Sequence, residues 1–251
     1  MSFKLKNKNK IFYEGKAKIL YFSDKKNTLI QYFKDDTTAF NAKKMDKINK
    51  KGILNNFISA HLFKGLEQIN IPHHFIKIIS EREQLIKQLK IFKIEIISRN
   101  YAAGSICKRL GINEGYKFNK PLIEFCLKDD KFNDPIISKQ HIQNLQLASK
   151  NEIKKIIELT SKINYFLTGI FFSIGIKFID FKLEFGKSYK SNDTNIYLAD
   201  EISPDNCRLW DIDSNKKLDK DRYRDDLGGL LEAYLDVSRR LGIKKVFKDG
   251  I

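Results

Sequence analysis

Four acidic side chains gather in one short stretch of a strongly basic chain. The segment ADEISPDNCRLWD, residues 199–211, holds these acids, one arginine and the only tryptophan: Asp200, Glu201, Asp205, Asp211, Arg208 and Trp210. Carboxylates this close repel one another unless positive charge joins them. We therefore expect bound ligands to bring the compensating charge. Glu201 and Asp211 are expected to cap or pair locally, and Trp210 to lie in the core.

A second stretch places charged side chains at the spacing of a β-strand. In KFIDFKLEF, residues 177–185, the alternation predicts Asp180, Lys182 and Glu184 on one face. The apolar side chains are predicted on the other face: Ile179, Phe181, Leu183 and Phe185. An ordinary half-exposed strand explains this pattern if it is taken alone.

A predicted partner strand favours a metal site at this face. NIYLADEI, residues 195–202, follows a polar loop, and a hairpin with 177–185 would bring Asp200 to the charged face. Three carboxylates and a lysine would then converge. Mg²⁺ suits them, because it is usually held by one or two carboxylates plus substrate phosphates. A zinc enzyme is not expected, since none of the four histidines stands at HExxH spacing.

A glycine turn near the start of the chain offers positive charge for a phosphate group. YEGKAK, residues 13–18, would put Lys16 and Lys18 on the same side of a hairpin, where they could lie over a triphosphate. The motif is neither GxGxxG nor GxxxxGK[ST]. A plain hairpin with surface lysines remains the alternative.

The elements that position these residues alternate between strands and helices. A hairpin around Gly15 is predicted at 11–22, and further strands at 28–34, 73–80, 91–100 and 121–128. A charged segment is predicted to join the strands at 73–80 and 91–100. Helices are predicted at 53–69, in a short piece after the loop at 102–105, from Ser149 to Gly175, and from Leu227 to Gly242. Ser149 and Glu152 form a predicted capping box. The pattern indicates an α+β protein of two lobes, residues 1–93 and 94–251.

The composition limits the kinds of partner. The net charge of +16 comes from 39 lysines and 8 arginines spread along the chain, so we expect small, multiply anionic substrates and no nucleic acid. The longest apolar run, residues 165–176, is too short for a membrane span. Cys107, Cys126 and Cys207 are odd in number and far apart, which favours a reducing compartment, the cytoplasm.

Several stretches together resemble the phosphoribosylaminoimidazole-succinocarboxamide synthase (SAICAR synthetase) family. The similarity covers nearly the whole chain, and DEISPDNCRLWD and RNYAAGS are its most specific motifs. The matching stretches are YEGKAK (13–18), DDTTAFNAKK (35–44), SRNYAAGSICKRLG (98–111), DFKLEFG (180–186), DEISPDNCRLWD (200–211) and DKDRYR (219–224).

The resemblance implies an ATP-dependent ligase of purine biosynthesis. Such an enzyme joins L-aspartate to the carboxylate of carboxyaminoimidazole ribonucleotide (CAIR) through an acyl phosphate, giving SAICAR, ADP and phosphate. It also implies an N-terminal antiparallel lobe of kinase-like small-lobe character that covers ATP, and a larger mixed C-terminal lobe, related to the ATP-grasp fold. Mg²⁺ is the implied cofactor. We also expect a homo-oligomer, most simply a dimer.

The resemblance assigns the nucleotide site residue by residue. Lys16 and Lys18 would face the ATP phosphates, with help from Lys128. Glu95 and the backbone of Ile97 would hold the adenine.

The metal and the reacting centre are assigned in the same way. Glu184 and Asp200 would bind magnesium. Asp180 and Lys182 would line the reacting centre as catalytic residues.

The ribonucleotide side of the site uses other motifs. The resemblance implies that Arg99 and Ser105 hold anionic groups of CAIR. Asp205, Arg208 and Arg224 would contact the same ribonucleotide, because arginine is the usual clamp for phosphate.

Two other functions would suit parts of the sequence. A small-molecule kinase or phosphotransferase would suit the N-terminal strands and their glycine turn, but the chain has no HRD catalytic loop and no DFG. An RNA-binding module would need aromatic residues interleaved with arginines on a sheet, and arginine is scarce.

Overall fold

The computed structural model describes residues 10–39 and 44–244. Its first layer is a five-stranded antiparallel sheet with the order β1-β2-β3-β7-β6. The strands are β1 (Ile11–Glu14), β2 (Lys18–Phe22), β3 (Thr28–Phe33), β6 (Phe75–Ser80) and β7 (Glu83–Lys87). Gly15 closes the β1–β2 turn through a backbone hydrogen bond to Lys18 O of 2.9 Å, so the predicted hairpin is confirmed.

The second sheet is also antiparallel and has the order β10-β9-β8-β11-β12, with β13 paired to β11. Its strands are β8 (Leu89–Tyr101), β9 (Lys117–Leu127), β10 (Ile136–Ile137), β11 (Ile176–Ser188), β12 (Ile196–Ala199) and β13 (Cys207–Asp211). A separate pair consists of β4 (Asp36–Ala39) and β5 (Lys44–Lys47). The two large antiparallel sheets confirm the expected α+β class.

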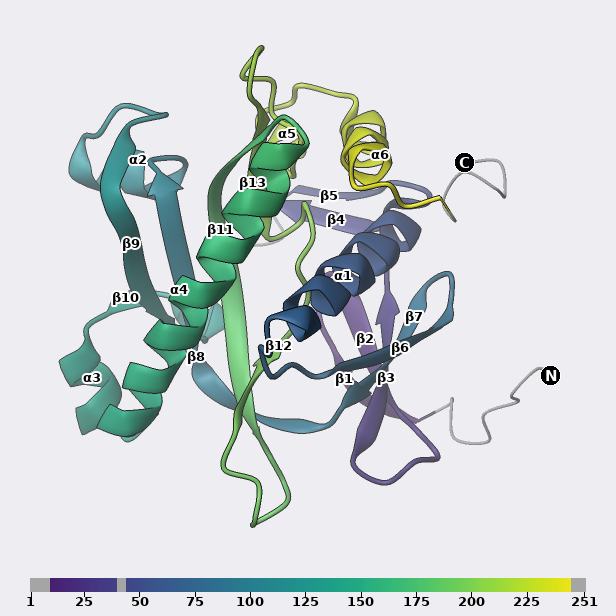
Figure 1. Ribbon diagram of the computed structural model, residues 1–251, viewed down its shortest axis with the longest axis vertical. Helices are drawn as coiled ribbons and strands as arrows, with labels where there is room; N and C mark the ends of the chain where they lie inside the picture. Colours follow the sequence, from purple (N-terminus) through teal and green to yellow (C-terminus); the bar gives the residue numbers. More distant parts are fainter. Residues whose placement is uncertain (1–9, 40–43, 245–251) are drawn as a thin grey trace.

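Helices cover both sheets. They are α1 (Lys51–Gln68), α2 (Ser105–Leu110), α3 (Lys139–Asn144), α4 (Lys150–Ser173), α5 (Asp221–Arg224) and α6 (Leu230–Arg240), besides a 3₁₀ turn at Asp130–Phe132. In Figure 1, α4 runs along β8 and β11, while α1 lies over the first sheet and beside α6. No helix within residues 10–39 and 44–244 is long and apolar enough to cross a membrane.

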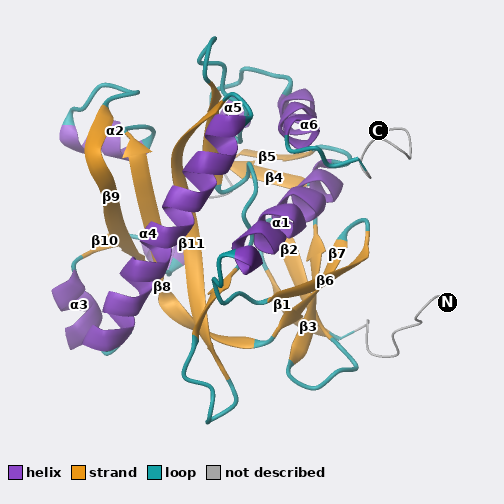
Figure 2. Cartoon of the chain, in the orientation of Figure 1, coloured by secondary structure: helices purple, strands orange, loops and turns teal. Residues whose placement is uncertain are grey.

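The start of α4 follows directly from its sequence. Ser149 Oγ accepts a hydrogen bond from the Glu152 backbone, and Glu152 Oε2 accepts one of 2.7 Å from the Ser149 backbone. This reciprocal arrangement is the predicted capping box, which satisfies backbone N–H groups that the first turn leaves free. In Figure 2 the helix lies across β8 and β11. Its apolar face is buried on that side.

The predicted alternation of β11 is wrong at one residue. Phe178 and Phe181 share the main core, with ring centroids 4.9 Å apart. Ile179 packs instead with Trp210 and Ala103 in a separate cluster. The cause is an irregularity in the pairing with β13, where the register shifts between Phe178 and Asp180. Trp210 is buried there, so its predicted place in the core is confirmed.

Two other expectations need correction. The charged segment between 80 and 91 contains a strand, β7, which pairs with both β3 and β6. Leu227 lies outside the last helix and is exposed, because α6 begins only at Leu230, after two glycines with positive φ. The division near residue 93, a position inside β8, stays a prediction.

A short segment before β6 joins the first sheet to β12. Leu198 N–H donates to Pro72 O at 2.8 Å, and His74 N–H donates to Leu198 O at 2.9 Å. These bonds fix the end of β12 beside the first sheet. The acidic segment that follows β12 therefore begins at the junction of the two sheets.

Candidate active site

Strand β11 carries three predicted site residues at alternate positions. Its antiparallel register with β8 sets each beside another predicted residue: Asp180 opposite Arg99, Lys182 opposite Ile97, and Glu184 opposite Glu95. The charged face expected from the alternation thus extends across two strands. Its residues separate into two groups along β11, one around Lys182 and Glu184 and one around Asp180.

The first group is a lysine–carboxylate cluster, made of Lys18, Glu95, Lys128, Lys182, Glu184 and Asp200. Lys182 Nζ donates to Glu95 Oε1 at 2.6 Å, and Lys128 forms an ion pair with Glu184. Burial lowers the pKa of Lys182, but the charges of Glu95 and Glu184 outweigh it and raise that pKa. Both lysines are therefore fully charged at neutral pH.

Lys18 brings the first sheet into this cluster. Its ammonium forms an ion pair with Asp200 and a second, of 2.8 Å, with Glu201 Oε1. Burial raises the pKa of Asp200, but the charges of Lys18, Lys182 and Lys128 lower it overall. Asp200 has a φ of 63°, a left-handed conformation that aspartate tolerates better than most residues. Beside it the buried His74 stays neutral, since burial lowers its pKa to about 3.

The carboxylates of this cluster fit a magnesium ion that arrives with a nucleotide. In the pairing of β11 with β12, Glu184 lies opposite Ala199. Asp200 is the next residue after Ala199, so the two carboxylates lie on neighbouring segments. The described residues contain no group of three or more His, Cys, Asp or Glu side chains that could hold a metal. Two hard oxygen donors alone bind Mg²⁺ weakly, but they suffice when substrate phosphates complete the coordination.

The second group is an arginine–carboxylate ladder, made of Arg99, Asp180, Arg208, Asp221 and Arg224. Asp180 Oδ2 accepts from Arg99 at 2.6 Å and from Arg208 at 2.9 Å. Arg208 Nε donates to Asp221 Oδ2 at 2.6 Å, and Arg224 donates to the other oxygen of Asp221. Positive and negative side chains alternate along the ladder, so three guanidinium groups can lie close together.

The order of the strands explains the ladder. Asp180 lies opposite Arg99 on β8 and opposite Arg208 on β13. Gly104, with a φ of 66°, lets the small-residue loop pack on Arg208, since a Cβ there would stand 2.8 Å from Arg208 Cζ. The structure therefore brings together two motifs that lie more than a hundred residues apart in the sequence.

The two ends of the ladder differ in exposure. Arg99 is 1% exposed and also donates to Glu124 Oε2 at 2.7 Å, so this end is buried. The side chain of Arg224 is 32% exposed. A ligand can therefore reach the Arg224 end more easily than the Arg99 end.

The acids of residues 199–211 are compensated by cations of the chain itself. Asp205 accepts from Lys51 Nζ at 2.6 Å and from Tyr234 OH at 2.7 Å, and both contacts are buried. Asp211 pairs with Arg240 at 2.8 Å and caps the turn at Ser214, as expected. Part of the compensating charge therefore comes from the chain itself, where the sequence led us to expect bound ligands. Lysines and arginines from distant segments supply it, which local sequence does not reveal.

Three predicted residues belong to neither group by their side-chain contacts. Lys16 is exposed in the β1–β2 turn, and Ser105 is exposed at the start of α2, directly after Gly104. Ile97 is half-buried on β8. The motif DDTTAFNAKK is described only in part, because residues 40–43 lie outside the described residues.

Some residues of the site were not singled out from the sequence. Lys51 opens α1 and is fully buried, and no local signal marks it. Tyr234 is fully buried on α6, and no motif marks it. Asp221 and Lys220 belong to DKDRYR, so the motif marked their segment without giving them roles.

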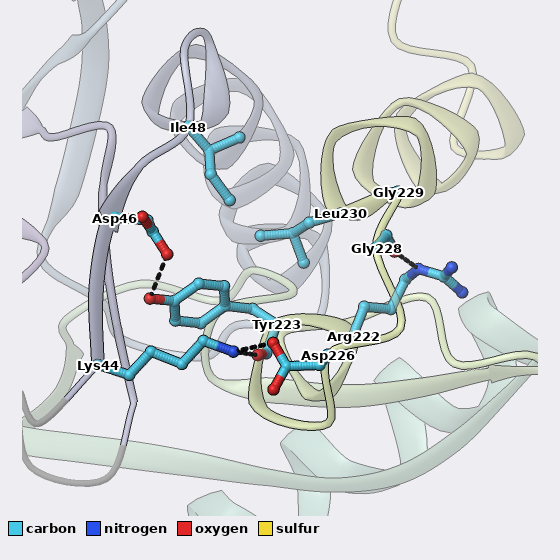
Figure 3. Close-up of a pocket in the computed structure, with 9 residues that line it drawn as sticks. All are labelled: Lys44, Asp46, Ile48, Arg222, Tyr223, Asp226, Gly228, Gly229 and Leu230. Atoms are coloured by element: carbon cyan, nitrogen blue, oxygen red, sulfur yellow. Dashed lines mark hydrogen bonds and ion pairs between the residues drawn. The ribbon is translucent and has the colours of Figure 1, made fainter.

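The DKDRYR segment and the residues after it contact β5. Figure 3 shows Lys44 Nζ meeting the Tyr223 carbonyl, at 2.8 Å, and the carboxylate of Asp226. Tyr223 OH donates to Asp46 Oδ2 at 2.9 Å. The pocket drawn there contains no predicted site residue. Its contacts instead hold the segment that carries Asp221 and Arg224.

The two antiparallel sheets meet at paired lysines and carboxylates beside a row of arginines, an arrangement typical of proteins that bind anionic groups. Comparison with known proteins narrows this class to a ligase. The sequence model of the SAICAR synthetase family matches residues 11–241. The chain therefore belongs to the SAICAR synthetase family.

Individual relatives agree with this assignment. The chain is 54% identical over 231 residues to phosphoribosylaminoimidazole-succinocarboxamide synthase of Sphingopyxis alaskensis, covering 92% of this chain and 90% of that protein. The crystal structure of the Ehrlichia chaffeensis synthase is 49% identical, with a TM-score of 0.91 over 93% of this chain and 98% of that one. A SAICAR synthetase in complex with ADP is 42% identical, with a TM-score of 0.88 over 92% and 97% of the two chains. The kinase alternative is not favoured.

Proposed function

We propose that this enzyme joins L-aspartate to the carboxylate of CAIR at the expense of ATP, giving SAICAR, ADP and phosphate. The observation that carries the proposal is the composition of β11. Lys182 and Glu184 belong to the lysine–carboxylate cluster and Asp180 to the ladder, so two sites for anions meet on one strand. ATP and the ribonucleotide that accepts its phosphoryl group must bind side by side, which two neighbouring anion sites would allow.

The proposed chemistry has two steps. A carboxylate oxygen of CAIR attacks the γ-phosphorus of ATP, the bond to the bridging oxygen breaks, and ADP leaves. The amine of aspartate then attacks the carbonyl carbon of the acyl phosphate. The C–O bond breaks, phosphate leaves with the electron pair, and the amine nitrogen gives up its proton. Both steps depend mainly on positioning and on charge neutralisation.

The residues take their roles from the two groups. Lys18 and Lys128 would stabilise negative charge on the ATP phosphates, and Lys182 would line the reacting centre with Asp180. Magnesium, held by Glu184 and Asp200, would neutralise further phosphate charge when bound. Lys16 is proposed to act over the nucleotide from the β1–β2 turn.

The remaining roles stay proposals. Glu95 and the Ile97 backbone would hold the adenine. The CAIR side would use Ser105 and Asp205 together with the arginines of the ladder: Arg99, Arg208 and Arg224. Asp180 would act at the reacting centre between two of these arginines. We also propose a homo-oligomer, most simply a dimer, that works in the cytoplasm.

A coupled assay of ADP release tests the proposal. ADP should form only with ATP, Mg²⁺ and CAIR together, and SAICAR should form only when aspartate is also present. Each component is omitted in turn, and glutamate replaces aspartate as the control amino acid. Equal turnover with glutamate, or rapid ADP release without CAIR, would contradict the assignment.

A further inference from the structure

Lys220 holds an unusual position among the cations of the site. It lies between Asp219 and Asp221, and its backbone N–H donates to Pro204 O at 3.0 Å. The residue is half-buried. Across residues 10–39 and 44–244 we find no ion pair or hydrogen bond of its ammonium group, in contrast to Lys18, Lys128 and Lys182.

The nearby carboxylate already has its own partners. Asp205 attracts Lys220, but its two oxygens accept from Lys51 and Tyr234. Burial lowers the pKa of Lys220, and the charges of Lys51 and Arg224 lower it further, against the attraction of Asp205 and Glu201. The lysine therefore lacks the compensation that the chain gives to its other buried cations.

The neighbours of Lys220 also locate it between the two groups of the site. Glu201 shares Lys18 with Asp200 in the lysine–carboxylate cluster. Arg224 ends the arginine–carboxylate ladder. Lys220 joins these two parts of the site, because its backbone N–H donates to Pro204 O at 3.0 Å, three residues after Glu201, and its carbonyl accepts from the Arg224 backbone N–H at 3.1 Å.

We propose that the Lys220 ammonium binds a carboxylate of the amino-acid substrate. The inference rests on the proposed function, in which three anionic substrates meet. The proposed function assigns the lysines of the cluster to the nucleotide and the reacting centre, and the three arginines of the ladder to the ribonucleotide, which leaves the dicarboxylic acid without an assigned cation. Its amine must reach the carbonyl carbon of the acyl phosphate, which forms where the other two substrates meet. An ammonium between the two groups satisfies both requirements.

The Lys220→Met variant tests this site, because it keeps much of the apolar stem and removes the charge. KM is measured for ATP, CAIR and aspartate in turn. The KM for aspartate should rise about ten- to a hundredfold, the range expected for one hydrogen bond to a charged group. The KM values for ATP and CAIR should stay close to those of the parent. Lys220→Arg, which restores the charge, should recover part of the aspartate affinity.

Lys217→Met is the matched control. Lys217 lies in the same segment and is half-buried, but its ammonium pairs with Asp225 at 2.9 Å and with Glu114 at 3.4 Å, away from both groups. Its KM for aspartate should not change. An unchanged aspartate KM in Lys220→Met would overturn the inference, and so would a rise confined to CAIR or ATP, which would make Lys220 a phosphate contact.

A second measurement on the unaltered enzyme decides the matter if the variants fail to fold. Lysine acetylation is followed by mass spectrometry with aspartate, with succinate, with CAIR or without ligand. Aspartate and succinate should protect Lys220, whereas protection by CAIR alone would overturn the inference. Failure of the proposed function is recognised separately, because the parent enzyme would then release no ADP with CAIR and aspartate.

Discussion

Asp221 holds two of the proposed substrate arginines at once, so its loss should weaken CAIR binding. Its side chain is 5% exposed, and its two oxygens accept from Arg208, at 2.6 Å, and from Arg224. The Asp221→Asn variant keeps the size of the side chain but replaces one acceptor oxygen by an NH₂ group. One guanidinium then faces a donor and must turn away.

The free energy that Asp221 contributes follows both from its hydrogen bonds and from its pKa. A hydrogen bond to a charged group contributes about 1.5–3 kcal/mol. Burial raises the pKa of Asp221, but Arg208 and Arg224 lower it from 3.8 to about 2. That shift corresponds to roughly 2 kcal/mol of stability. It is present above about pH 4 and is lost as the pH falls toward the folded-state pKa, because the unfolded chain then binds the proton more tightly.

These magnitudes set the expected results. At neutral pH the melting temperature of Asp221→Asn should fall by about 4–8 °C, since 1 kcal/mol corresponds to about 2–4 °C in a chain of this length. CAIR should bind about ten- to thirtyfold more weakly if the arginines lose their positions. ATP, which uses the other group, should bind as it does to the parent. Calorimetry with each ligand and a thermal melt provide the three values.

Asp236→Asn serves as the control for this variant. Asp236 pairs with Arg240 at 2.9 Å on α6, and its side chain is 28% exposed. A surface pair of this kind contributes at most about 1 kcal/mol. Both ligand affinities should stay at the parent values. If Asp221→Asn lowers the melting temperature and leaves CAIR affinity intact, Asp221 only stabilises the fold and the reasoning is refuted.

Two further predictions concern the metal and the pH. Glu184→Gln and Asp200→Asn each remove a charged oxygen, so both should raise the Mg²⁺ concentration for half activity; unchanged dependence in both would exclude them as ligands. Burial and the charge of Asp221 raise the pKa of Asp219 from 3.8 to about 7. The folded chain then binds this proton more tightly than the unfolded chain, so stability should fall as the pH rises from about 4 to about 7. Melting temperatures at several pH values should show a weaker decline in Asp219→Asn, and an identical decline would argue against the shift.

The elements that sequence predicts best are those with a strong internal period. The helix α4 shows its apolar face and its capping box in the sequence, and both are present. Strand β7 was missed, because Glu83–Lys87 is short and charged at both ends. Its conformation is fixed by pairing with strands on either side. The shift at Ile179 has the same origin, since it arises from pairing with β13.

The site was predictable in its residue types but not in its pairings. Motifs pointed to Arg99, Asp180 and Arg208, and the strand register sets these three side by side. Which cation compensates which acid depends on contacts between distant segments. Lys51 and Asp205, for example, are separated by 154 positions. No local period or motif carries such information.

The paired charges of the site also set a condition on ligand binding. A phosphate that takes Lys18 or Lys128 must release a carboxylate, Asp200 or Glu184. Both pairs are partly buried, so a carboxylate that is left without its lysine loses compensation at a cost in free energy. A divalent cation that enters with the nucleotide avoids this cost, since the carboxylates gain a new partner as the lysines turn to the phosphates. Nucleotide and metal are therefore expected to bind jointly, and this accounts for acidic residues at the centre of a basic protein that binds anions.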